Sequence, residues 1–108
     1  MHEHLKNHGD GVKDIALLVE DATALHDVSV AKGAKSVKAP YTLEDANGKV
    51  IMSAIATYGD TIHTFVQRVD FKGVFLPGYT PHPFKEVLNE VMPTIKFNFI
   101  DHIVGNQA

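Results

Sequence analysis

The dipeptide Asn47-Gly48 is the feature that most restricts how this chain can fold. Asn-Gly is the strongest short-range signal for a tight β-hairpin, because both residues tolerate the positive φ angles of such a turn. Alternating apolar residues on either side predict one strand over residues 36–45 and another over residues 50–58. Pro40 predicts an edge position or a bulge, because proline cannot donate to a strand ladder. The centre of the chain is therefore expected to be antiparallel sheet.

The segments around this hairpin complete a β-α-β-β-β order. Val12 to Val19 is a nearly unbroken apolar run, typical of a strand covered on both faces. Asp21 is suited to cap a following helix and Gly33 to end it, and Thr61 to Val69 reads as a fourth strand. The sequence therefore predicts an α+β module. Because one helix covers only part of a four-stranded sheet, we expect the chain to form a homo-oligomer.

The segments outside this module have weaker patterns. Met1 to Gly11 is polar, and its three histidines indicate a solvated lead-in more than a metal site. Residues 71–79 form an apolar loop that must cover something. Pro83 and the apolar stripe after it predict a connector helix within 83–92. Alternating residues after Pro93 predict a strand through His102, and one strand histidine by itself is more often ordinary than a ligand.

Composition excludes several classes of function. The chain has 108 residues, enough for one small domain, and a formal charge of −3, which gives no footprint for nucleic acid or an anionic membrane. It has no cysteine, so disulfides and thiolate catalysis are excluded. No apolar run reaches the roughly 20 residues of a membrane helix, and the start does not read as a signal peptide. We therefore expect a cytoplasmic protein.

Four segments resemble the 4-hydroxyphenylpyruvate dioxygenase family, most closely its animal-type members, in order and in spacing. They are residues 8–16, 58–66, 75–79 and 100–106. This family has the vicinal oxygen chelate fold, in which a full enzyme contains four β-α-β-β-β modules. The resemblance implies that residues 1–69 are the second module of the N-terminal half, 70–93 a connector loop and helix, and 94–108 the truncated first strand of the catalytic half. The chain is then expected to be a fragment, lacking the module before Met1 and most of the catalytic half after Ala108.

The resemblance also implies a chemistry. The family is an iron(II)-dependent oxidoreductase that converts 4-hydroxyphenylpyruvate and dioxygen to homogentisate and carbon dioxide, in tyrosine and phenylalanine catabolism. Its iron is held by two histidines and one glutamate. His102 matches the first histidine, whereas the other ligands and the substrate contacts fall beyond Ala108. We therefore expect His102 to be a metal ligand in a homodimeric parent enzyme, and this chain alone to bind iron loosely and to be inactive.

Two other readings stay open. Hydroxymandelate synthase shares the substrate, iron and fold, and the residues that distinguish it lie outside this chain. A stand-alone dimeric module that binds a ligand without oxidising it is a second possibility, although the strand at His102 has no purpose there. Superposed modules put Asp14 at the position of His102, and His63 near a common carboxylate ligand. We read both as structural, with His63 hydrogen-bonded across the sheet.

Overall fold

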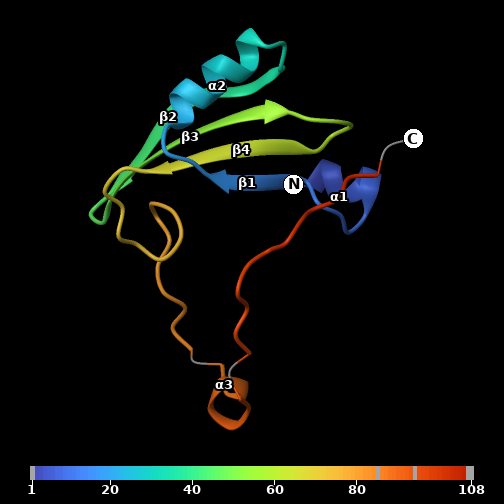
Figure 1. Cartoon of the computed structure of the whole chain (residues 1–108). Helices are drawn as coiled ribbons and strands as arrows, with labels where there is room; N and C mark the ends of the chain where they lie inside the picture. The colour runs from blue at the N-terminus through green and yellow to red at the C-terminus, as the bar shows by residue number, and fades with distance from the viewer. Residues whose placement is uncertain (1, 85, 94, 107–108) are drawn as a thin grey trace.

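The computed structural model describes residues 2–84, 86–93 and 95–106, and of residue 89 only the backbone. Its elements are, in chain order, α1 (His2–His8), β1 (Asp14–Leu18), α2 (Ala22–Ala31), β2 (Ser36–Asp45), β3 (Gly48–Ala56), β4 (Ile62–Arg68) and α3 (Leu88–Val91). The strands form one sheet in the order β1-β4-β3-β2 (Figure 1). β1 is parallel to β4, and the other pairs are antiparallel. The predicted α+β class and β-α-β-β-β order are confirmed.

The hairpin between β2 and β3 is present, with a small difference at its turn. Asp45 pairs with Gly48, so Ala46 and Asn47 form the turn and Gly48 begins β3. Gly48 supplies the positive φ, 115°, which follows the turn as in hairpins closed by a bulge. The ladder of β2 also shifts register between Lys38 and Tyr41, where Pro40 lies at the sheet edge. The predicted edge position and bulge are both confirmed.

Helix α2 covers one face of the sheet and is fastened to it by polar side chains. Asp21 caps the helix by accepting hydrogen bonds from the backbone N–H groups of residues 23 and 24. The buried Ser53 hydroxyl donates to the Ala22 carbonyl at 2.9 Å, and Gln67 accepts from the Ala22 N–H at 3.1 Å. His26 Nε2 meets the Ser36 hydroxyl at 2.9 Å. These bonds fix the helix over β2, β3 and β4.

The opposite face holds a small apolar core. Val50 and Met52 of β3 pack with Phe71, and all three are less than a tenth exposed. Four partly buried side chains surround them: Tyr41, Leu43, Val66 and Leu76. Phe71 and Leu76 come from the loop after β4, so this loop covers the sheet where α2 does not. The prediction that the apolar loop covers something is confirmed.

Hydrogen bonds hold this loop against the hairpin. Asp45 accepts from the Gly78 N–H at 2.9 Å and from the Asn47 N–H at 2.7 Å. Asp70 accepts from the Lys49 N–H at 2.8 Å. The guanidinium of Arg68 donates to the Phe75 carbonyl at 2.8 Å. The loop is therefore attached on both sides of Phe71.

The N-terminal segment is solvated, as expected, because none of the described residues of α1 is buried, but its helix was not predicted. It contacts the sheet through His8 Nε2, which lies 2.8 Å from the Asp60 carboxylate. β1 is shorter than Val12 to Val19 and mostly exposed, not covered on both faces. The reason is its edge position, because β4 is its only neighbour in the described sheet.

The expectations for the C-terminal part also differ from the structure. The connector helix is one short turn, Leu88–Val91, and its apolar side chains Leu88 and Val91 are exposed. Residues 95–106 contain no strand, and Thr94 lies outside the described residues. A strand needs a neighbour to receive its backbone hydrogen bonds. Among the described residues none is available to this segment.

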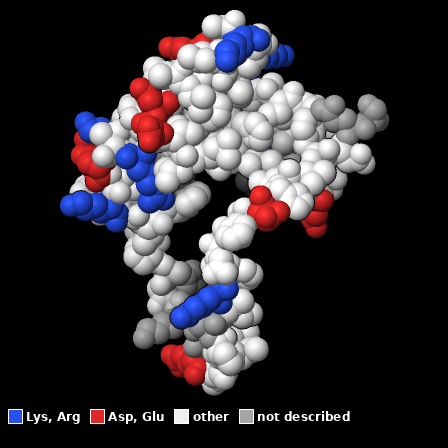
Figure 2. Space-filling model, viewed as in Figure 1, with Lys and Arg blue, Asp and Glu red and all other residues white. Residues whose placement is uncertain are grey.

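The described residues 80–84, 86–93 and 95–106, which we call the C-terminal arm, loop away from the sheet, and the end of the arm returns beside α1 (Figure 1). The radius of gyration is 16.8 Å, whereas a compact chain of this length has about 13 Å. The accessible surface is 8872 Å², whereas about 5,900 Å² is typical of this mass. Figure 2 shows the arm as a mostly uncharged surface. No described helix has both the length and the apolar character to cross a membrane.

Gly48 gives a first prediction. A Cβ there lies 2.7 Å from the Asp70 carbonyl oxygen, at a φ of +115°. Gly48→Ala is therefore predicted to lower the free energy of unfolding by about 2 kcal/mol or more. Gly33→Ala is the matched control, because Gly33 has a φ of +101° but no atom within 4 Å of a Cβ. Urea denaturation followed by circular dichroism measures both, and equal losses would contradict the close approach.

Asp45 gives a prediction about pH. Hydrogen bonds from the backbone of Gly78, and then of Asn47, hold the pKa of its carboxyl below the usual value. A lowered folded-state pKa stabilises the fold above the unfolded pKa, near 4, and this stabilisation is lost as pH falls through the folded pKa. Asp45→Asn is therefore predicted to lower the free energy of unfolding at pH 7. Between pH 5 and pH 2, this variant should lose less of its free energy of unfolding than the parent protein does. Urea midpoints across this range measure the effect. Asp10→Asn, on the turn after α1, is the control, and an identical acid response in all three proteins would refute the prediction.

Candidate functional site

The sheet face opposite α2 carries a shallow hollow of about 280 Å³. Its lining includes Asp14, Lys38, Tyr41, Met52, Ala54, Ile62 and Thr64. The register places Ala54 beside Thr64 and Ile62 beside Asp14, so β1, β4 and β3 contribute to one surface, to which β2 adds Lys38 and Tyr41. The Lys38 ammonium lies 3.8 Å from the centre of the Tyr41 ring. The hollow is thus an apolar floor with one carboxylate and one ammonium at its margin.

Asp14 is held at this margin by its neighbour on β4. The Thr64 hydroxyl donates to the Asp14 carboxylate at 2.6 Å. This bond joins the seam between the two parallel strands. The carboxylate that occupies the superposed position of His102 therefore has a structural partner in this module.

His63 lies on the other face. It is adjacent to Thr64 in β4, and successive side chains of a strand point to opposite faces. Its Nδ1 lies 3.3 Å from the Ile15 carbonyl of β1, which is the expected bond across the sheet. Asp14 and His63 therefore cannot converge on one metal ion.

His102 lies in the C-terminal arm. Its side chain is 72% exposed, and its Nδ1 is hydrogen-bonded to the carboxylate of Asp101. Among residues 2–84, 86–93 and 95–106, no three His, Cys, Asp or Glu side chains are grouped so that they could hold a metal. Iron(II) in a facial triad needs three protein ligands. The described residues therefore do not fit a complete iron site.

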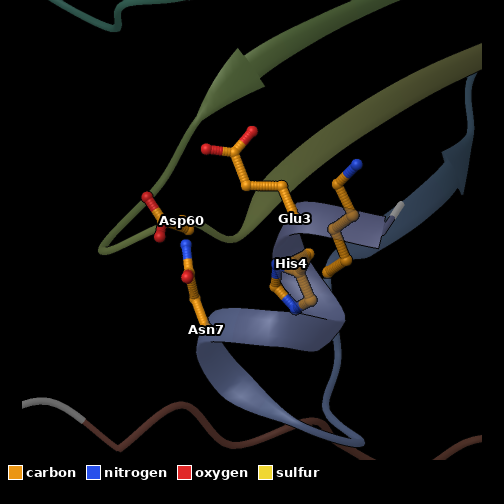
Figure 3. A pocket seen from close by; sticks show the side chains of 5 residues that line it. Glu3, His4, Asn7 and Asp60 are labelled. Carbon is orange, nitrogen blue, oxygen red and sulfur yellow. The ribbon is translucent and has the colours of Figure 1, made fainter.

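A second hollow, of about 310 Å³, lies between α1 and the turn that joins β3 to β4. Glu3, His4 and Asn7 line it from α1, together with Lys13 and Asp60, and Figure 3 shows Asn7 and Asp60 facing one another. This polar surface was not predicted. The signal was the spacing of His4 and His8, because residues four apart lie on one side of a helix. Their ring centres are 4.7 Å apart.

No protein-family model matches this chain. Individual proteins of similar sequence are found. The chain is 50% identical over 107 residues to 4-hydroxyphenylpyruvate dioxygenase of Tetrahymena thermophila, 99% of this chain and 26% of that protein. It is 49% identical over 108 residues to the Danio rerio protein of that name, 99% and 27% of the two chains. The Dictyostelium discoideum protein of the same name is 44% identical over 107 residues, 98% and 29%.

Solved structures add little. A virulence protein of Salmonella typhimurium matches with a TM-score of 0.45 and 17% identity, over 55% of this chain and 48% of that one. This likeness is too low to bear on function. The sequence relatives are much closer, and the chain spans about a quarter of their length. The resemblance inferred from four short segments thus extends over nearly all of this chain, which is similar to one portion of the 4-hydroxyphenylpyruvate dioxygenases.

Proposed function

We propose that this chain is part of an iron(II)-dependent dioxygenase that converts 4-hydroxyphenylpyruvate and dioxygen to homogentisate and carbon dioxide. The observation that carries the proposal is an identity of 42–50% to proteins of that name, over 97–99% of this chain. Identity at this level over four strands and a whole arm is far more specific than a shared fold. The reaction places the enzyme in the catabolism of tyrosine and phenylalanine.

Within this enzyme, His102 serves as one iron ligand. Its hydrogen bond supports this role, because metal-binding histidines usually donate their second ring N–H to a carboxylate or carbonyl. Asp101 accepts from Nδ1, which leaves Nε2 to face a metal. Iron(II), when bound, supplies open coordination positions for the 2-oxo acid and dioxygen. The remaining protein ligands come from outside these 108 residues.

The division of the chain follows from the same proposal. Residues 1–69 form the second module of the N-terminal half, 70–93 the connector, and 94–108 the first strand of the catalytic half. The bare apolar arm supports this division. Ile95, Phe97 and Phe99 are between 73% and 89% exposed, and such side chains gain stability only when a neighbouring element covers them.

Replacement of His102 tests the proposal most directly. In the full-length enzyme, His102→Ala is predicted to lower the turnover of 4-hydroxyphenylpyruvate by more than about 100-fold and to lower iron content, because one ligand is lost. His82→Ala is the matched control, because His82 is also exposed and lies in the same arm. Oxygen uptake and product analysis measure the outcome. Near-normal turnover of the His102 variant contradicts the proposal. If the parent enzyme releases 4-hydroxymandelate in place of homogentisate, the enzyme is a hydroxymandelate synthase. The isolated chain should consume no oxygen.

We also propose that the isolated chain self-associates. Its accessible surface exceeds the value typical of its mass by about 3,000 Å², whereas a stable interface needs only about 800 Å² from each partner. Much of the excess lies in the C-terminal arm, where apolar side chains are exposed. Contact between copies removes this surface from water.

Sedimentation velocity tests self-association. Dimers or larger species are predicted at micromolar concentrations. Phe97→Asp should shift the chain toward monomer, because Phe97 is 89% exposed and central to the apolar arm. Asn98→Asp adds the same charge at the neighbouring polar residue and should change little. A folded monomer at high concentration would count against this proposal.

A further inference from the structure

The C-terminal arm returns to the module at Gly105, which lies directly against Tyr58. A Cβ on Gly105 would overlap the Oη and Cζ atoms of Tyr58. Neighbouring heavy atoms in proteins do not approach a Cβ closer than 3.0 Å. Tyr58 belongs to the turn between β3 and β4. Figure 1 shows the arm leading back to this end of the sheet, beside α1.

The glycine is required by this contact and not by its backbone. Gly105 is not among the glycines with positive φ, so alanine fits its backbone without strain. Gly11 offers a comparison, because it also has no positive φ but nothing lies within 4 Å of its Cβ position. Among the described residues, the three atoms that would lie nearest to a side chain at residue 105 all belong to the phenol ring of Tyr58.

The contact also restricts where His102 can lie. Three residues of extended chain span at most about 11 Å, so docking of Gly105 on Tyr58 keeps His102 within roughly that distance of the Tyr58 contact. The hydrogen bond from the Gly78 N–H to Asp45 holds the chain just before the arm. The described residues 95–104, which precede Gly105, are exposed. Tyr58 is then the point of the module that fixes the end of the arm.

We propose that Tyr58 is a positioning residue for His102, acting through its ring contact with Gly105. This inference rests on the proposed role of His102 as an iron ligand. Tyr58 touches neither metal nor substrate in this scheme. It sets the place at which the arm leaves the module, and thereby the place of the imidazole three residues earlier.

The contact itself is tested on the 108-residue chain by NMR at low protein concentration. A nuclear Overhauser effect between the Tyr58 ring and the Gly105 Hα protons is expected in the parent and in Tyr58→Phe, which keeps the ring. It should disappear in Gly105→Ala, with the amide shifts of β3 unchanged because the fold is intact. Its absence from the parent would overturn the inference.

The positioning role is tested in the full-length enzyme by a double-mutant cycle read as iron(II) affinity. Gly105→Ala is expected to weaken iron binding about tenfold, but less than twofold when Tyr58 is already Ala, because the obstacle is gone. Gly11→Ala should have no effect in either background. Equal losses from Gly105→Ala in both backgrounds, or no loss in either, overturn the positioning role.

The two proposals fail differently. If His102→Ala leaves iron affinity unchanged, the proposed function fails, and the positioning role fails with it even when the NMR contact is present. If His102→Ala abolishes binding while the cycle shows no coupling, only the role of Tyr58 fails. Iron affinity that depends on His102, together with coupling of Gly105 to Tyr58, supports both.

Discussion

The packing of Phe71 against Val50 and Met52 is the contact on which the rest of the structure depends. A four-stranded sheet has two faces, and this module has one helix of ten residues to cover them. The loop after β4 must therefore return to the open face and bury an aromatic ring there. Its return fixes the positions of Asp45, Arg68 and Asp70, and it determines where the C-terminal arm begins. Beyond this small core, part of the open face and the whole arm lack cover from the described residues.

The parts of the fold that sequence predicted are those with local causes. Asp21 caps α2 through its own neighbours, Gly48 has the positive φ that its turn demands, and Pro40 marks the interrupted ladder of β2. Each depends on residues within a few positions of it. The predictions that were wrong are the cover of β1 on both faces and the strand around His102, which both depend on a neighbouring element. β1 is an edge strand because of the sheet order, and the segment around His102 lacks a partner for its backbone among the described residues.

The candidate site follows the same division. Pattern alone could not distinguish His102 from an ordinary histidine, and the prediction that it is a ligand rests on the likeness to a known family. The relation of Asp14 to His63 needed the register of β1 against β4, because strand alternation decides the face only once the pairing is known. The surface on α1 could have been found from the helical spacing of His4 and His8. The close approach of Tyr58 and Gly105 joins residues 47 positions apart and has no sequence signal.

The chain consists of an ordered module and an arm whose described residues are exposed. Native-state hydrogen exchange of the amides in residues 48–56 and 95–104, at the lowest workable concentration, measures this division most directly. We predict strong protection in β3, where the amides lie in a central strand, and almost none in the arm. Comparable protection of both segments in a monomeric sample would contradict it, because the arm would then be folded against the module without any partner.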